Sequence, residues 1–393
     1  MIKIAALKSP LGDLGVGNDY KCMRYAILLY SLIILLLQSC NKKHEVLEEL
    51  EELKEEIAKE DEPVSRTILV YMAADNDLSD DAYVDLEEMQ RGFTEKGTNL
   101  LVFIDPADDV PQILEITPGG SKTVKVYPEF NSADAVKMGQ VLSEMIRMYP
   151  ADESGLILWS HGTSWLPAGS RLRSFGRDNG KQMNIPDLAN NLPAHFDFIL
   201  FDACLMGSVE VAYELKDKAD YIIASSTETI YEGFPYDLII TELLQTKIDF
   251  NAVAESYFDY YNAQDGAYRS ATISVIETRY LPELAYSLKE LFENNAVNLQ
   301  AFDRTSVQRL DTFNEQYVFD LSDFVDKLFP DANKTDFKAQ LNRIVRYKNH
   351  TPQFLLEYNI NTYCGLSCYI PHPERNDLTM YYKTLKWYKD VYP

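Results

Sequence analysis

Cysteine is scarce in this chain. Only five cysteines occur among 393 residues, at positions 22, 40, 204, 364 and 368. A chain of this length with so few cysteines lacks the spacing from which a disulfide framework is built. Cys364 and Cys368 are the nearest pair, but on one strand they would lie about 13 Å apart, too far for a disulfide bond. The fold therefore has to rest on a hydrophobic core, which a chain of this length can bury.

Positive charge is also scarce. Lys and Arg total 37 against 61 Asp and Glu, which gives a formal net charge of -24. Repulsion from phosphate excludes nucleic acid as an expected partner. This negative charge is compatible with a soluble surface. It would also favour basic substrates.

No apolar run is long enough to span a bilayer. The longest, Ala26 to Leu37, has about a dozen residues where about 20 are needed. It follows Met23-Arg24 and ends in Leu37-Gln38-Ser39-Cys40, which resembles a bacterial lipoprotein signal, with an ordinary signal peptide or a short anchor as the alternatives. We expect residues 1–22 to be an upstream start-site artefact and 23–39 to be the signal. A lipid on Cys40 would hold the protein on a membrane surface of the bacterial cell envelope.

Repeats are absent, and the one biased segment is acidic. Glu45 to Glu62 holds ten acids and two lysines, with a narrow apolar stripe of about two heptads, which is short for a coiled coil. We interpret residues 40–64 as a solvated, partly helical tether that ends near Pro63. A core domain at 65–250 and a C-terminal α+β region at 251–393, packed on that core, are expected to follow.

Apolar runs and amphipathic stretches then alternate along the chain. Helices are expected at 82–93, 132–148, 250–261, 281–292, 318–329 and 337–345. Strands are expected at 67–72, 99–104, 221–226, 272–276 and 359–370, with a hairpin at 112–116 and 123–127. This alternation predicts an α/β fold with a largely parallel sheet flanked by helices.

Two further strands end in reactive side chains. Gly155 to Trp159 leads to His161-Gly162, and Phe198 to Phe201 leads to Asp202-Ala203-Cys204. Alone, each residue is more often structural than catalytic. If the strands are neighbours, thiol and imidazole meet at the sheet edge where α/β proteins bind ligands.

Such a pair suits attack on a carbonyl carbon. That reaction needs a thiolate and a proton donor for the leaving amine, and His161 can serve both needs. The backbone N–H groups of Gly162 and Cys204 can stabilise the oxyanion. The hypothesis is a Cys204–His161 dyad.

These motifs resemble the clostripain family of cysteine peptidases, relatives of caspases and gingipains. The similarity extends roughly over residues 66 to 393 and includes the stretches 71–78, 85–89, 228–236 and 365–371. It implies a caspase-like three-layer fold and an endopeptidase that cleaves after Arg or Lys without a cofactor. It also implies that Asp202 lies at the base of the specificity pocket, where a carboxylate pairs with the basic side chain. Capping of a helix is the alternative role for Asp202, and Glu228 and Glu232 are weaker second acids for substrate binding.

The connection after His161 is glycine-rich and basic. We expect residues 166–183 to form an exposed, flexible loop beside the site. Clostripain-like relatives mature by cutting this connection, so the resemblance implies self-processing after one of four residues: Arg171, Arg173, Arg177 or Lys181. The two fragments should stay together in a monomer.

Calcium, which some relatives need, is not supported by a recognisable ligand cluster. Asp75-Asn76-Asp77 lacks the spaced ligands and closing Glu of a calcium loop, so helix capping is its expected role. No metal site is predicted.

Two other functions remain open. One is a catalytically silent, surface-binding lipoprotein with the same fold, against which the intact His161, Cys204 and Asp202 argue. The other is an adhesion or structural module of the envelope, which neither repeats nor sandwich-like strand spacing support.

Overall fold

The computed structural model describes residues 65–94, 97–167 and 174–392, which belong to one compact unit spanning Val64–Pro393. The expected start artefact (1–22), signal (23–39) and tether (40–64), with Cys40, lie outside the described residues. Among the residues that are described, no helix has the length and apolar character needed to cross a bilayer.

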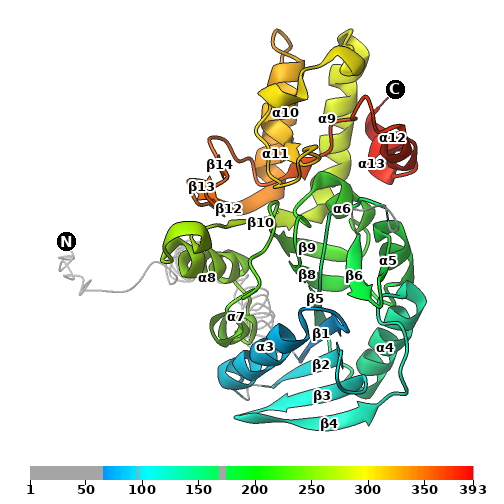
Figure 1. The fold of residues 1–393 in the computed structure, drawn as a ribbon, viewed down its shortest axis with the longest axis vertical. Helices are drawn as coiled ribbons and strands as arrows, with labels where there is room; N and C mark the ends of the chain where they lie inside the picture. Colours follow the sequence, from blue (N-terminus) through cyan, green and yellow to red (C-terminus); the bar gives the residue numbers. More distant parts are fainter. Residues whose placement is uncertain (1–64, 95–96, 168–173, 393) are drawn as a thin grey trace, which may run out of the picture. The chain divides into compact units, whose positions relative to one another are not determined.

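A nine-stranded mixed sheet organises this unit, in the order β12-β10-β9-β8-β5-β1-β2-β3-β4 (Figure 1). The five central strands are parallel: β9 (Ala219–Ala224), β8 (Phe196–Asp202), β5 (Glu153–Trp159), β1 (Arg66–Ala74) and β2 (Thr98–Pro106). Antiparallel strands complete both edges: β3 (Gln112–Thr117), β4 (Gly120–Val126), β10 (Thr272–Glu277) and β12 (Val345–His350). Every residue of β1 is buried, as expected for an apolar strand covered on both faces.

Helices cover both faces of the sheet, because each presents an apolar stripe to it. One face carries α3 (Ser79–Gly92), α7 (Tyr236–Leu243) and α8 (Phe250–Asn262), whose buried residues share a core with the side chains of that face. The other face carries α4 (Ala135–Met148), α5 (Ile185–Asn191), α6 (Val209–Glu214) and α9 (Leu281–Asn294) (Figure 1). The α/β expectation is confirmed, with a sheet that is parallel at its centre and mixed at its edges.

The region after residue 250 contributes both to this sheet and to further elements beside it. Strands β10 and β12 extend the sheet, and α9 joins the core of its second face. Further helices are α10 (Leu321–Leu328), α11 (Thr335–Ile344), α12 (Asn376–Tyr382) and α13 (Lys386–Val391). Short strands are β11 (Phe319–Asp320), β13 (Gln353–Phe354), β14 (Tyr358–Asn359) and β15 (Ser367–Cys368). Single turns of 3-10 helix occur at η2 (Gly266–Tyr268), η3 (Thr278–Tyr280), η4 (Leu299–Ala301) and η5 (Arg304–Ser306).

The predicted helices agree with the observed ones to within three residues at each end. The strand predicted at 359–370, in contrast, is wrong. Only β14 and β15 occur at its two ends. Between them, residues 363–366 are buried, Asn361 and Thr362 are exposed, and Gly365 has φ +95°, so the strand does not continue. Two backbone N–H groups of this region bond to acidic side chains. Asp320 accepts the N–H of Cys364 (2.6 Å), and Glu210 accepts the N–H of Tyr369 (2.8 Å). Cys364 and Cys368 are both free, as expected.

Candidate functional site

The two reactive strand ends lie side by side. Strands β5 and β8 are parallel neighbours, and Trp159 is in register with Asp202. His161 and Cys204 each follow two residues later, so the two side chains leave the sheet at the same edge. The expectation that these strands are neighbours is confirmed.

A pocket of about 230 Å³ opens at this edge. Its wall contains the thiol, the imidazole and a carboxylate, together with backbone from the segment after β9. The lining residues are Leu78, Trp159, Ser160, His161, Asp202, Ala203, Cys204, Thr229, Ile230, Tyr231 and Gly233. A nucleophile, a base and an anion therefore share one cavity.

The Cys204 thiol is held by the backbone of Thr229. Its Sγ accepts the Thr229 N–H at 3.3 Å and lies 3.6 Å from the Thr229 carbonyl oxygen. Burial, and repulsion by Glu228 and Asp202, raise the pKa of Cys204 to about 12, so the thiol is protonated at neutral pH. Helix α6 begins five residues later, at Val209. Sequence analysis missed Thr229.

His161 is oriented by Asp77, which sequence analysis treated as a capping residue. The imidazole Nε2 lies 3.2 Å from Asp77 Oδ1, and Arg177 pairs with the same oxygen. Partial burial works to raise the pKa of Asp77, but hydrogen bonds from its own backbone and from His161, with the charge of Arg177, outweigh it and lower the pKa. Helix α3 begins at Ser79, and its N-cap residue, Leu78, makes no side-chain cap. The capping prediction for the triplet is therefore wrong for Asp75 and Asp77, whereas Asn76 Oδ1 accepts the Leu78 N–H at 2.9 Å.

Gly162 lets the His161 segment approach the cysteine closely. A Cβ at Gly162 would lie 2.7 Å from the Cys204 carbonyl oxygen and 3.0 Å from the Ala203 Cβ. The two backbone bonds that join this segment to its neighbour run from Thr163 N–H to Ser174 and from Gly176 N–H to the His161 carbonyl. Neither uses the Gly162 N–H. A side chain at this position would clash with the segment that carries the nucleophile, so the close approach requires glycine.

Asp202 is a buried residue in the wall of the pocket. One carboxylate oxygen accepts the Phe234 N–H at 3.1 Å and the Tyr236 hydroxyl at 2.8 Å. Burial raises the pKa of Asp202, and these two bonds oppose that rise. Gly233 has φ +62°, and a Cβ there would lie 2.6 Å from the same carboxylate, so this turn requires glycine. Asp202 does not cap helix α6, whose cap is Ser208.

Glu228 and Glu232 do not line this pocket. Glu228 Oε1 accepts the backbone N–H (2.8 Å) and the hydroxyl (2.7 Å) of Thr312. Its observed contacts tie the segment after β9 to the chain near residue 312.

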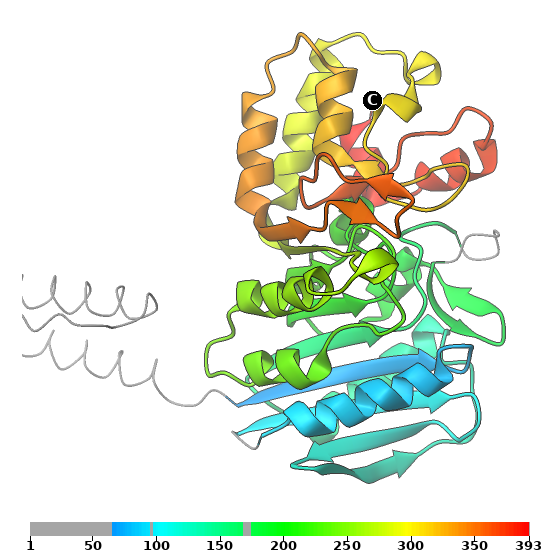
Figure 2. The ribbon, with the colours of Figure 1, turned by 60° about the vertical axis from the view of Figure 1, so that its left-hand side comes forward.

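Residues 175–183 of the segment after His161 have regular structure, contrary to the expected loop. Residues 175–183 form a hairpin of β6 (Phe175–Asp178) and β7 (Lys181–Met183), with Phe175 fully buried. Figure 2 shows this hairpin beyond the end of the sheet toward which β1 points. Arg177 and Lys181 belong to it, whereas Arg171 and Arg173 lie outside the described residues. The apolar Phe175 and Met183 were the signal that sequence analysis overlooked.

Two comparisons of the sequence with known proteins lead to the same family. Residues 70–386 match the model of the clostripain family. The chain is 25% identical to clostripain from Hathewaya histolytica over 427 residues, covering 83% of this chain and 79% of that protein.

Two solved structures are similar over most of the chain. An inactive zymogen C11 protease from Parabacteroides distasonis has a TM-score of 0.75 and 34% identity, covering 84% of this chain and 99% of that one. A secreted C11 cysteine protease from Bacteroides thetaiotaomicron, solved with an irreversible peptide inhibitor, has a TM-score of 0.74 and 30% identity, covering 84% and 99%. The expected fold class is confirmed.

Proposed function

The chain belongs to the clostripain family of cysteine proteases, and from this premise we propose that it is an endopeptidase that cleaves after Arg or Lys. The observation that carries this proposal is the single pocket lined by Cys204, His161 and Asp202. The wall of this pocket contains a nucleophile, a base and a buried acid. A catalytically silent binding protein would have no use for this combination.

Proton transfer from Cys204 to His161 begins the reaction. Because burial raises the thiol pKa to about 12, a base is required, and Asp77 stabilises the imidazolium that forms. The bond between Sγ and the substrate carbonyl carbon then forms, and the carbonyl π electrons move to oxygen. The N–H groups of Gly162 and Cys204 are the proposed donors to that oxyanion.

Collapse of this intermediate breaks the C–N bond. His161 gives its proton to the leaving amine, which leaves an acyl-enzyme thioester. Water, deprotonated by His161, hydrolyses the thioester and restores the thiol. For the first step the substrate has to displace the Thr229 backbone from Sγ, since its N–H bond to sulfur is present in this structure.

Asp202 supplies the preference for basic residues in this proposal. A substrate Arg or Lys that fills the pocket would place its charge against a buried carboxylate, which accepts hydrogen bonds from the Phe234 N–H and the Tyr236 hydroxyl. The positive charge of a bound substrate side chain would stabilise this buried carboxylate.

Self-processing is proposed for the start of the connection after His161. Arg177 lies within β6 and pairs with Asp77, so a cut after it would require the hairpin to open. We therefore assign the cut to Arg171 or Arg173 and not to Arg177 or Lys181. Both fragments would contribute strands to one sheet, β5 before the cut and β8 after it, so they would remain associated.

Anchoring to the cell envelope through a lipid on Cys40 is a separate proposal that rests on the sequence Leu37-Gln38-Ser39-Cys40. In a Gram-negative host the protein should incorporate labelled palmitate, and Cys40→Ser should abolish the label. Incorporation into the Cys40→Ser protein, or none in the wild type, would refute it.

The decisive experiment is a panel of fluorogenic peptides with Arg, Lys, Ala or Asp before the cleaved bond. Residues 41–393 should cleave the Arg and Lys substrates, and Cys204→Ala should cleave none. Wild-type activity confined to the Ala or Asp peptides would refute the specificity. Ordinary turnover by Cys204→Ala would refute the nucleophile.

A further inference from the structure

Two exposed tyrosines form a pair beside the catalytic pocket. Tyr231 is one of the residues that line this pocket, yet 55% of it is exposed to solvent. Tyr268, the last residue of η2, does not line the pocket and is 50% exposed. The two rings are in contact, with their centroids 6.4 Å apart. The pair therefore continues the wall of the pocket onto the exposed surface of the protein.

The arrangement of the two rings suits an apolar ligand. Their planes meet at 77°, an edge-to-face arrangement in which the rings bound an angle instead of covering each other. A single exposed tyrosine needs no explanation, because apolar atoms make up much of any protein surface. Two exposed tyrosines in contact, continuous with a binding pocket, are different, because exposed apolar surface of this kind marks a place where a ligand packs.

Both rings are held in place before a ligand arrives. Tyr231 belongs to a turn in which the Gly233 N–H donates to the carbonyl oxygen three residues earlier, at 2.9 Å. The Tyr261 hydroxyl donates to the Gly233 carbonyl oxygen at 2.6 Å, which ties this turn to α8. Tyr268 lies in the turn that follows the same helix. Hydrogen bonds to Tyr268 and Glu232 raise the pKa of Tyr231, so its ring stays uncharged at neutral pH. A preformed surface reduces the entropy lost on binding.

The order of the strands places this pair on one side of the nucleophile. Strand β8, which leads to Cys204, lies between β5 and β9 (Figure 1). His161 follows β5, whereas the segment that carries Tyr231 follows β9. Tyr268 precedes β10, which is the antiparallel neighbour of β9, so it belongs to the same side of the same sheet edge.

That side is where the acyl part of a substrate would lie. In the proposed mechanism His161 protonates the leaving amine, so the substrate chain after the cleaved bond lies on the side of β5. The chain before the cleaved bond stays on the sulfur of Cys204 as the acyl group. It therefore extends toward β9 and the two tyrosines.

We propose that Tyr231 and Tyr268 bind an apolar side chain of the substrate, at one of the two residues that precede the basic residue. This inference rests on the proposed function, since the direction of the substrate follows from the catalytic residues. An extended chain rises about 3.3 Å per residue, so two residues cover about 7 Å. That length matches the 6.4 Å between the ring centroids.

The chemistry of the pair defines which substrates it favours. Leu, Met and Phe gain apolar contact with the rings and leave no polar group unpaired. Asp and Glu would bring a negative charge close to Glu232, which follows Tyr231 in the sequence, and would be disfavoured. The enzyme would therefore select an apolar residue followed closely by Arg or Lys, and not every Arg or Lys.

A panel of peptides tests the proposal on the wild-type protein. All peptides carry Arg before the cleaved bond, and one of the two residues that precede this Arg is varied among Leu, Phe, Ala and Asp. At one of these positions kcat/KM should be about tenfold or more higher for Leu or Phe than for Ala, and lowest for Asp. The difference should lie mainly in KM, because the contact is present in both the bound substrate and the transition state.

Variants assign the preference to the rings. Tyr268→Ala removes a ring that does not line the pocket, and it should bring the Leu-to-Ala ratio of kcat/KM to within about threefold of one. Tyr268→Phe keeps the ring and should keep the ratio. Tyr286→Ala is the matched control: it removes another exposed tyrosine, from α9 on the other face of the sheet, and should leave the ratio and the activity unchanged.

Equal kcat/KM for the Leu, Phe and Ala peptides at both positions would overturn the proposal. A preference that survives Tyr268→Ala, or that falls equally in Tyr286→Ala, would overturn it too, because the rings would not be its cause.

Failure of the proposed function has a different signature, namely no cleavage of any Arg or Lys peptide, or cleavage that does not require Cys204. Binding of fluorescently labelled peptides to Cys204→Ala, measured by anisotropy, decides the inference without turnover. The Kd should be about tenfold or more lower for the Leu peptide than for the Ala peptide, and equal Kd values would overturn the inference.

Discussion

The substitution Asp202→Asn separates specificity from catalysis. It removes the negative charge of a buried residue in the pocket wall but keeps the size of the side chain. The amide oxygen can still accept the Phe234 N–H, now at 3.1 Å, and the Tyr236 hydroxyl, now at 2.8 Å. The turn at Gly233 and the wall of the pocket should therefore survive. What is lost is the charge that meets the substrate's Arg or Lys.

The expected loss of activity follows from the burial of Asp202, whose exposed fraction is 5%. Truncating one partner of a desolvated charge pair costs about 2 to 4 kcal/mol, which corresponds to a fall in kcat/KM of about 30- to 1000-fold. This loss should appear on Arg and Lys peptides. Ala peptides gain nothing from the carboxylate, so their kcat/KM should change less than about threefold.

The pH profile supplies a second readout with a defined sign. Burial raises the pKa of Asp202 above its ordinary value, so its charge is lost as the pH falls from neutrality toward about 4. Cleavage after Arg should decline in that window more steeply than cleavage after Ala, and Asp202→Asn should remove the difference. Because a raised carboxyl pKa disfavours the folded state at neutral pH, the variant should be at least as stable as wild type at pH 7. Equal loss on Arg and Ala peptides, or a lowered melting temperature, would mean that Asp202 is structural.

Three further outcomes are expected. His161→Ala should lower kcat/KM by several orders of magnitude and leave the melting temperature within a few degrees of wild type; a loss of less than tenfold would exclude His161 as the base. Gly162→Ala should reduce kcat about tenfold to a hundredfold, because the new Cβ would lie 2.7 Å from the Cys204 carbonyl oxygen and displace the nucleophile. An unchanged kcat would argue against a role for the Gly162 backbone in catalysis. Wild-type protein should run as two bands on a denaturing gel and as one species by size exclusion, with the second fragment beginning at Leu172 or Ser174; a cut elsewhere, or a fully active single chain, would refute the assigned sites.

Much of the fold could be predicted because the signal is local. Apolar runs such as Phe198 to Phe201 and amphipathic stretches such as 135–148 carry their period within the segment itself, so they agree with the observed elements to within a few residues. The strand expected at 359–370 failed because this backbone is not one continuous ladder: within it only the ends pair, Asn359 with β13 and Ser367–Cys368 with β11. Its backbone partners, Asp320 and Glu210, are more than forty residues away in sequence. No window of sequence contains that information.

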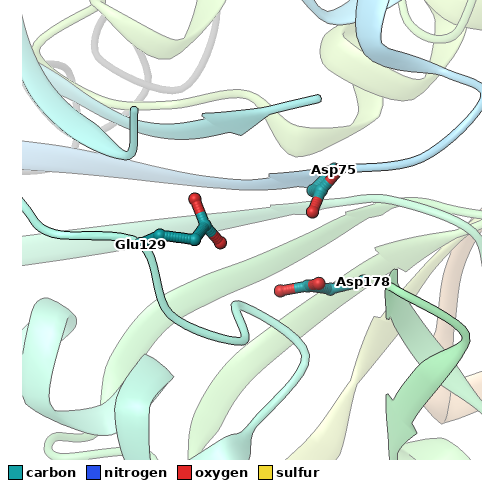
Figure 3. A group of neighbouring side chains, drawn as sticks. All are labelled: Asp75, Glu129 and Asp178. Carbon is teal, nitrogen blue, oxygen red and sulfur yellow. The ribbon is translucent and has the colours of Figure 1, made fainter. Parts of the chain in front are cut away.

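The sequence by itself determined that His161 and Cys204 each follow a strand, because a short apolar run ends where reactive residues begin. The order of strands in the sheet decided that these two strands are neighbours and in register. Tertiary structure alone brought Thr229 onto the thiol and Asp77 onto the imidazole, and it raised the thiol pKa by burial. It also gathered the carboxylates of Asp75, Glu129 and Asp178 (Figure 3), which are 103 residues apart from first to last. Contacts of this kind depend on chain topology, and desolvation depends on everything packed around a group; neither leaves a periodic trace in the sequence.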